Sequence, residues 1–252
     1  MPPSLPPLDV GACTDVGQVR LENQDAHALF PYGAAGPDGP ALFLVADGMG
    51  GEADGARASR LAAERFSATF FAGTGDLEAD LRAAVAEANR AVWEATADGR
   101  RMGTTCTALV LAPTPPGAEA VLAHVGDSQA YQIGDDGDAR LVSRDHTVAE
   151  EMHASGVLTA EEAARHPRRH ALTRSIGTEA AVEPDVVRLG PTPSGTRFVL
   201  CSDGLAEVSP DEIAEAARRY GAQEAAEWLV ALANSRGGRD NVTVVVVHVL
   251  PA

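Results

Sequence analysis

The length, composition and charge of this chain limit what it can be. Its 252 residues are enough for one substantial hydrophobic core, and we expect a single domain over residues 8–252 behind a flexible lead-in, residues 1–7. The formal net charge of -16 argues against nucleic acid or an anionic membrane as a partner, because basic surfaces bind both. A surface this acidic would instead collect cations.

The predicted elements of the first half are strands over residues 8–14 and 41–47, then two amphipathic helices over 52–71 and 76–97. Three further strands, which we expect to form an antiparallel meander, are predicted over 104–111, 120–125 and 129–133. The charged interval 145–173 is predicted to be a peripheral lid with one or two short helices.

The second half of the chain continues with strands over 197–201 and 242–249 and helices over 210–219 and 222–233. Strands and helices are segregated along the sequence rather than alternating regularly. This order favours an α+β fold with antiparallel sheets at the core and helices outside.

Targeting signals are not apparent. The N-terminus lacks an apolar segment of signal-peptide length, and the most apolar run, residues 242–250, is too short to cross a bilayer. The cysteines Cys13, Cys106 and Cys201 share no metal-binding spacing and are predicted to be small buried residues. We therefore expect a cytoplasmic protein.

In the stretch 41–51, an apolar run is followed by Asp47 and then by three glycines within four residues. Residues 48–53 also fit the loose dinucleotide pattern of a glycine-rich turn between a strand and a helix. The acidic strand end that a nucleotide fold needs about 20 residues later is missing. Taken alone, the stretch is compatible with a metal site, a nucleotide loop or a plain turn.

An aspartate at a strand end recurs four times, as Asp47, Asp127, Asp203 and Asp240. A single such residue usually caps a turn, but four of them change the interpretation. If these strand ends meet at one edge, the carboxylates must take up protons or bind cations. Oxygen ligands without His or Cys indicate Mg²⁺ or Mn²⁺.

An ordered set of motifs then resembles the metal-dependent Ser/Thr protein phosphatases of the protein phosphatase 2C (PPM) family, in their compact bacterial form. The motifs are Asp15-x-Gly17-x-x-Arg20-x-x-Asn23-x-Asp25, Val45-Ala-Asp47-Gly-Met-Gly-Gly51, Gly103-Thr-Thr105, Val125-Gly-Asp127-Ser128, Arg144-Asp-His146, Leu172-Thr-Arg-Ser-Ile-Gly177, Ser202-Asp203-Gly204 and Asp240-Asn241. Each motif is weak, but the ordered set is specific.

The resemblance implies a four-layer α-β-β-α sandwich, with a metal site at one end of two antiparallel sheets and a flap subdomain at about 147–171. By position, the implied residues are Asp47 with the Gly48 carbonyl bridging two metals, Asp203 and Asp240 on the first metal, Asp25 acting through water, Asp127 with Asp203 on a third, weaker metal, and Arg20 on the substrate phosphate.

The implied activity is hydrolysis of phosphoserine and phosphothreonine in proteins by a metal-bridged hydroxide, without a phosphoenzyme. Mn²⁺ or Mg²⁺ is the implied cofactor, and the implied partners are phosphorylated proteins, the targets of a Ser/Thr kinase; we expect a monomer. The alternatives are a catalytically inactive phosphoprotein-binding module on the same fold and, more remotely, a nucleotide-dependent oxidoreductase.

Two positions depart from the family pattern. Met49 stands where eukaryotic relatives often carry a histidine, and a thioether cannot donate a proton. Gln24 is a glutamate in many relatives, so we expect weaker binding of the second metal here.

Three other features receive structural interpretations or remain open. His124, His146 and His248 lack partners at zinc spacing and are predicted to be structural. Residues 134–138 are predicted to be a hairpin loop rather than a calcium loop. The basic cluster over 165–170 is either a solvated loop or a surface that attracts acidic phosphorylated segments.

Overall fold

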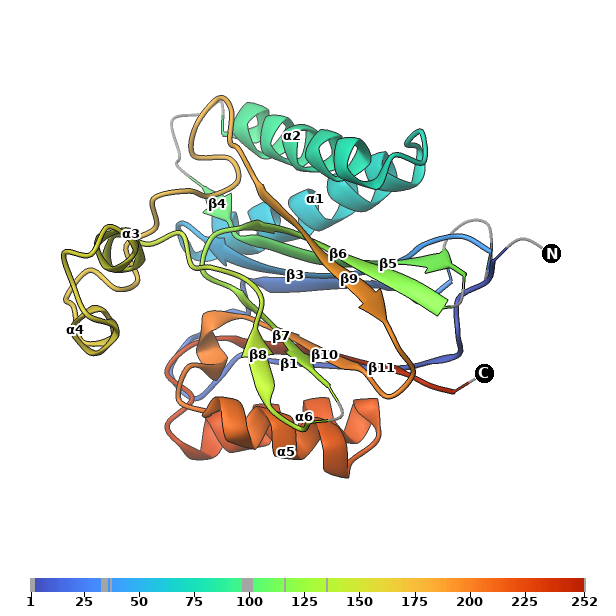
Figure 1. Ribbon diagram of the computed structural model, residues 1–252. Helices are drawn as coiled ribbons and strands as arrows, with labels where there is room; N and C mark the ends of the chain where they lie inside the picture. Colours follow the sequence, from blue (N-terminus) through green and yellow to red (C-terminus); the bar gives the residue numbers. More distant parts are fainter. Residues whose placement is uncertain are drawn as a thin grey trace.

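The structure is a computed structural model that describes residues 3–32, 36, 38–96, 102–115, 117–134 and 136–251. It forms four layers, with two antiparallel sheets stacked between two pairs of helices (Figure 1). This arrangement confirms the predicted α-β-β-α sandwich. Within the described residues, no helix is long and apolar enough to cross a membrane.

The first sheet has the order β1-β11-β10-β7-β8 and is covered by helices α5 and α6 (Figure 1). Its elements are β1 (Leu8–Asp15), β11 (Val242–Val249), β10 (Arg197–Cys201), β7 (Gln129–Ile133), β8 (Ala139–Leu141), α5 (Pro210–Arg219) and α6 (Ala222–Ser235). A short 3-10 helix, η1 (Asp203–Leu205), follows β10.

The second sheet has the order β2-β3-β5-β6-β9 and is covered by α1 and α2, with β4 paired to the end of β3. Its elements are β2 (Asp25–Phe30), β3 (Ala41–Met49), β4 (Gly103–Thr104), β5 (Cys106–Thr114), β6 (Gly117–Val125), β9 (Asp185–Thr192), α1 (Glu52–Phe71) and α2 (Leu77–Ala95). All its strand pairs are antiparallel, so residues 48–53 do not open a parallel dinucleotide-binding unit.

Successive side chains of the central strands point to opposite faces of the sheets, and together they build three hydrophobic cores. In β3, Phe43 and Val45 face the other sheet, whereas Leu42 and Leu44 face α1 and α2. The Val-rich β11 is also buried on both faces, because one face packs against the other sheet and the opposite face packs against α5 and α6. Central strands buried on both sides hold the strand ends rigidly, which matters for any site built there.

The predicted meander is wrong at its third strand. β5 and β6 pair as expected, but β7 leaves that sheet and pairs with β10 in the other one. The chain turns at Gly126, whose φ of +110° favours glycine, and a Cβ there would lie 2.6 Å from Thr105 Cγ2. The place beside β6 is taken by β9, an edge strand that contains Gly190 and Pro191 and was not predicted.

The lid predicted over 145–173 carries α3 (Val148–Ala154) and α4 (Ala160–Ala164) and lies at one end of the sandwich (Figure 1). A bridge between Thr147 and Leu172 closes its base. The domain boundaries remain predictions. In the lead-in, residues 1 and 2 lie outside the described part, and Leu5 is 6% exposed and joins the core between the sheets.

Candidate active site

The two sheets bring carboxylates together at the end of the sandwich nearest the lid. Asp25 opens β2 and lies directly opposite Asp47 near the end of β3. Asp25 Oδ2 accepts a hydrogen bond of 2.7 Å from Ser202 Oγ, whereas its Oδ1 is buried and has no hydrogen-bond partner among the described residues. An orphaned buried oxygen beside a second carboxylate is a site that a cation would satisfy.

Asp47 is held in place by hydrogen bonds of its backbone. Its N–H donates to Thr105 Oγ1 at 2.8 Å, and its carbonyl accepts from the backbone N–H of Thr105 at 2.9 Å. The next residue must be glycine, because a Cβ at Gly48 would lie 2.1 Å from the carbonyl oxygen of Gly55. The end of β3 and the start of α1 thus lie too close together for any side chain at position 48.

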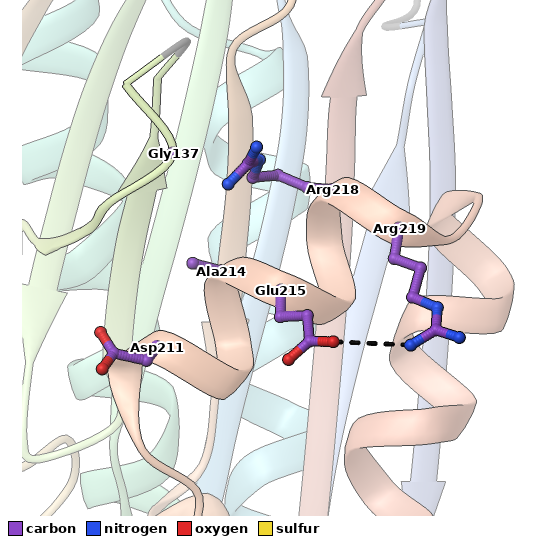
Figure 2. A pocket seen from close by; sticks show the side chains of 6 residues that line it. All are labelled: Gly137, Asp211, Ala214, Glu215, Arg218 and Arg219. Carbon is purple, nitrogen blue, oxygen red and sulfur yellow. Dashed lines mark hydrogen bonds and ion pairs between the residues drawn. The ribbon is translucent and has the colours of Figure 1, made fainter.

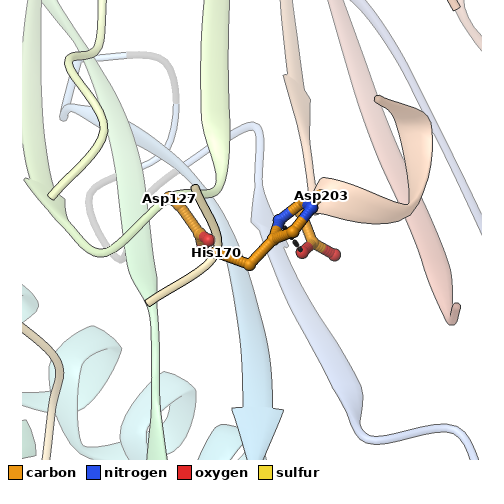
Figure 3. A group of neighbouring side chains, drawn as sticks. All are labelled: Asp127, His170 and Asp203. Carbon is orange, nitrogen blue, oxygen red and sulfur yellow. Dashed lines mark ion pairs between the residues drawn. The ribbon is translucent and has the colours of Figure 1, made fainter. Parts of the chain in front are cut away.

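The other sheet contributes Asp203 at the start of η1 and Asp240 just before β11, and Asp127 lies in the corner after β6. The flap, residues 147–171 of the lid described above, adds His170, whose Nδ1 lies 3.6 Å from Asp203 Oδ2. Figure 3 shows His170 between Asp127 and Asp203, and one ligand atom from each residue lies within 4.8 Å of the others.

The electrostatics show how closely these carboxylates converge. Burial and then the charge of Asp203 raise the pKa of Asp127 to about 8. The pKa of Asp47 is raised well above its usual range, first by burial and then by Asp25 and Asp203. Burial and the charge of Asp240 likewise raise the pKa of Asp203. Mutual repulsion in a poorly solvated site is the condition under which divalent cations bind well.

The loop before β2 carries Arg20 to the mouth of this cluster. Its Nη2 lies 2.7 Å from Asp240 Oδ2. Asn241 ties the loop to the sheet: its Oδ1 accepts from the Gln24 N–H at 2.8 Å, and its Nδ2 donates to the carbonyls of Val16 and Glu22 at 2.9 Å each. A cationic side chain therefore stands beside the carboxylates in an otherwise acidic protein.

The structure brings together every aspartate selected from the sequence and places Arg20 next to them. Two contributors were missed: Ser202, which anchors Asp25, and His170, which the flap folds back over Asp203. His170 is 43 residues from Asp127 and 33 from Asp203 in the sequence, so no local spacing could connect them. The basic cluster in which it stands was the one available signal.

Two of the three histidines predicted to be structural, His124 and His146, contact the protein's own polar groups. The ring of His124 bonds Thr107 Oγ1 at 2.9 Å and the Arg144 carbonyl at 3.1 Å, and burial lowers its pKa to about 3. His146 Nδ1 accepts from the Gly126 N–H at 3.1 Å, which ties the base of the lid to the turn before Asp127. Neither lies in a group of metal-ligand type among the described residues.

A separate pocket of about 390 Å³ lies on α5, lined by residues that include Asp211, Arg218 and the loop residue Gly137 (Figure 2). It contains none of the carboxylates above. Two of its charged side chains, Glu215 and Arg219, form an ion pair of 3.5 Å, whereas the converging carboxylates lie at the strand ends instead.

Known proteins with a similar sequence and fold agree with a metal site at the strand-end carboxylates. The sequence matches the family Protein phosphatase 2C over residues 17–236. The serine/threonine phosphatase stp of Listeria innocua is 33% identical over 247 residues, which cover 93% of each chain. The PPM Ser-Thr phosphatase MsPP from Mycobacterium smegmatis, solved in complex with cacodylate, is similar in structure with a TM-score of 0.82 and 37% identity, covering 96% of this chain and 98% of that chain.

A further solved structure is the catalytic domain of the serine threonine protein phosphatase PstP in complex with 2 manganese ions. Its TM-score is 0.81 at 35% identity, and the match covers 97% of this chain and 99% of that chain. The present chain belongs to the protein phosphatase 2C family. It is a metal-dependent protein phosphatase rather than an inactive phosphoprotein-binding module on the same fold.

Proposed function

We propose that the chain hydrolyses phosphoserine and phosphothreonine monoesters in proteins, with two divalent cations, Mn²⁺ or Mg²⁺, at the strand-end carboxylates and a third, weaker ion beside them. The observation that carries the proposal is the pairing of Asp25 with Asp47, which sets two half-buried carboxylates opposite each other and leaves the buried Asp25 Oδ1 without a hydrogen-bond partner among the described residues. Carboxylate and carbonyl oxygens are the metal ligands that Mg²⁺ and Mn²⁺ prefer.

Each group in the cluster then receives a role. Asp47 with the Gly48 carbonyl, Asp203 and Asp240 would hold the two main ions, Asp25 would act through water, and Asp127 with Asp203 would hold the third. When bound, the ions offset the charge of a phosphate dianion and lower the pKa of the water that attacks phosphorus.

The protein's own side chains would bind the substrate, and they favour hydrolysis without a covalent phosphoenzyme. Arg20 can leave Asp240 and donate two parallel hydrogen bonds to the phosphate, because both side chains are well exposed. A covalent phosphocysteine is disfavoured, since burial raises the pKa of Cys106 and of Cys201 to about 12. Met49 has no proton to give, so we assign the protonation of the leaving oxygen to water.

The proposal also covers the partners of the chain. Serine/threonine phosphatases among the relatives support phosphorylated proteins as partners, and we propose that these are the targets of a Ser/Thr kinase. A monomeric state and a cytoplasmic location remain predictions from the sequence.

An assay of phosphate release from matched phosphoserine, phosphothreonine and phosphotyrosine peptides tests the proposed function. We expect turnover of the first two with Mn²⁺ and none with a chelator. A preference for phosphotyrosine would contradict the proposed substrate class, and undiminished turnover with chelator would contradict the metal requirement.

A further inference from the structure

The flap contributes one side chain to the carboxylate cluster, and it is an imidazole. His170 lies over Asp203 with 3.6 Å between Nδ1 and Oδ2, and Asp127 completes a group of three potential ligand atoms within 4.8 Å (Figure 3). The 3.6 Å separation is longer than a hydrogen bond. The ring and the carboxylate therefore face each other at ion-pair distance, without a direct hydrogen bond.

The backbone around His170 is anchored, so its position is a property of the fold. The next residue, Ala171, donates its N–H to the Arg168 carbonyl at 3.1 Å and accepts from the Val148 N–H at 3.0 Å. Leu172 then bridges to Thr147 at the base of the flap. The ring thus projects from the fixed end of the flap, whereas Asp127 and Asp203 come from strand ends of the two different sheets.

Three such atoms can close on a divalent cation with small side-chain movements. Metal–ligand bonds of about 2.0–2.2 Å place neighbouring ligand atoms roughly 3–4.4 Å apart, slightly closer than the 4.8 Å limit seen here. The half-buried Asp203 and the exposed His170 can make this movement while the buried Asp127 stays fixed. Carboxylates accept Mg²⁺ readily, but an imidazole nitrogen favours transition metals.

We propose that His170 supplies a nitrogen ligand to the third ion, which makes this position select a divalent transition metal over Mg²⁺ and lets the ion tie the flap to both sheets. The inference rests on the proposed function only in placing a third ion at Asp127 and Asp203. It adds a ligand, a metal preference and a structural consequence for the flap.

Titration with Mn²⁺, followed by the electron paramagnetic resonance signal of the free ion, measures how many ions bind and how tightly. Pulsed measurements on the bound ion detect an imidazole nitrogen directly. The proposed ligands at the other two positions are oxygens, so such a nitrogen signal would arise from His170. We expect it in the wild type and not in His170→Ala, where the weakest class of Mn²⁺ sites should weaken at least about tenfold.

Two further variants sharpen the test. His170→Asp replaces the nitrogen with an oxygen ligand, so we expect it to retain the third ion, lose the nitrogen signal and allow excess Mg²⁺ to displace Mn²⁺. His166→Ala is the matched control, because it removes an imidazole from the same flap segment, where its ring accepts from the Arg168 N–H at 3.2 Å. It should keep the wild-type nitrogen signal and metal preference.

Hydrogen exchange of residues 148–171 reports the link to the flap. We expect protection of this segment to rise with Mn²⁺ in the wild type and in His166→Ala, but not in His170→Ala. An absent nitrogen signal in the wild type, or one that survives in His170→Ala, would overturn the inference. The proposed function would then still stand if phosphopeptide turnover requires Mn²⁺, and it would fail separately if the chelated wild type is fully active.

Discussion

Arg20 and Asp240 form an ion pair across the mouth of the carboxylate cluster, with 2.7 Å between Nη2 and Oδ2. The side chains are 52% and 36% exposed, so the pair is easily broken and contributes little to stability. The same carboxylate is a proposed metal ligand, and the same guanidinium is the proposed phosphate ligand. In the proposed function, Arg20 would therefore compete with a cation for Asp240 until substrate arrives.

Replacing this arginine separates the two roles. We expect Arg20→Ala to raise KM for phosphopeptides at least about tenfold, because a charged hydrogen-bonded contact to phosphate is lost. Mn²⁺ affinity should be unchanged or tighter, since Asp240 loses its competitor. Arg82→Ala, which breaks an exposed ion pair with Glu183, is the control. Weakened Mn²⁺ binding with an unchanged KM would contradict this account.

Gln24 offers a test of charge near the second metal. Its Nε2 donates to the Gly51 carbonyl at 3.3 Å at the start of α1, and its side chain packs against Gly55. We expect Gln24→Glu to lower the Mn²⁺ concentration for half-maximal activity a few-fold, because it adds a carboxylate beside the site. Leu21→Glu adds the same charge to the same loop at a side chain that is 92% exposed. If the two variants behave alike, the local charge is not the cause.

The basic cluster of the flap is a candidate for substrate attraction, since Arg168 and Arg169 are both exposed. We expect Arg168→Ala with Arg169→Ala to raise KM for phosphopeptides a few-fold and to leave a small aryl phosphate nearly unaffected. The matched control is the pair Arg218 and Arg219, two consecutive arginines on α5 in a pocket whose lining includes none of the strand-end aspartates. Equal effects on both substrates would rule out a role in attracting peptide segments.

Buried His124 gives the fold a predictable response to acid. Its folded-state pKa of about 3 lies below the value of 6.5 for an ordinary histidine, mainly because of burial. The unfolded chain therefore takes up the proton first, and stability is lost as pH falls below 6.5. Between pH 7 and pH 5 this residue should cost about 2 kcal/mol of unfolding free energy. His124→Gln should show a correspondingly smaller loss in urea unfolding; an identical loss would contradict the assignment.

Local signals in the sequence predicted most strands and helices and the aspartates at strand ends, whereas the four-layer arrangement was implied by the family resemblance. Apolar runs such as 242–249 are buried on both faces, and Asp47 or Asp203 stands where a strand stops. What the sequence could not predict depends on contacts between distant segments. The crossing of β7 to the other sheet follows from Gly126 packing against Thr105, and His170 reaches the cluster because the base of the flap is fixed.

Asp47 is the residue on which the whole account depends, since it faces Asp25 and is proposed to lie between two ions. The most direct test measures Mn²⁺ binding and phosphopeptide turnover together in the wild type and in Asp47→Asn, which keeps the size of the side chain. We expect the variant to stay folded, lose the tight class of Mn²⁺ sites and lose at least about three orders of magnitude in kcat, since the charge that binds the catalytic ions is gone. Full turnover by Asp47→Asn, or by the wild type in chelator, would show that hydrolysis does not depend on metal ions held by Asp47.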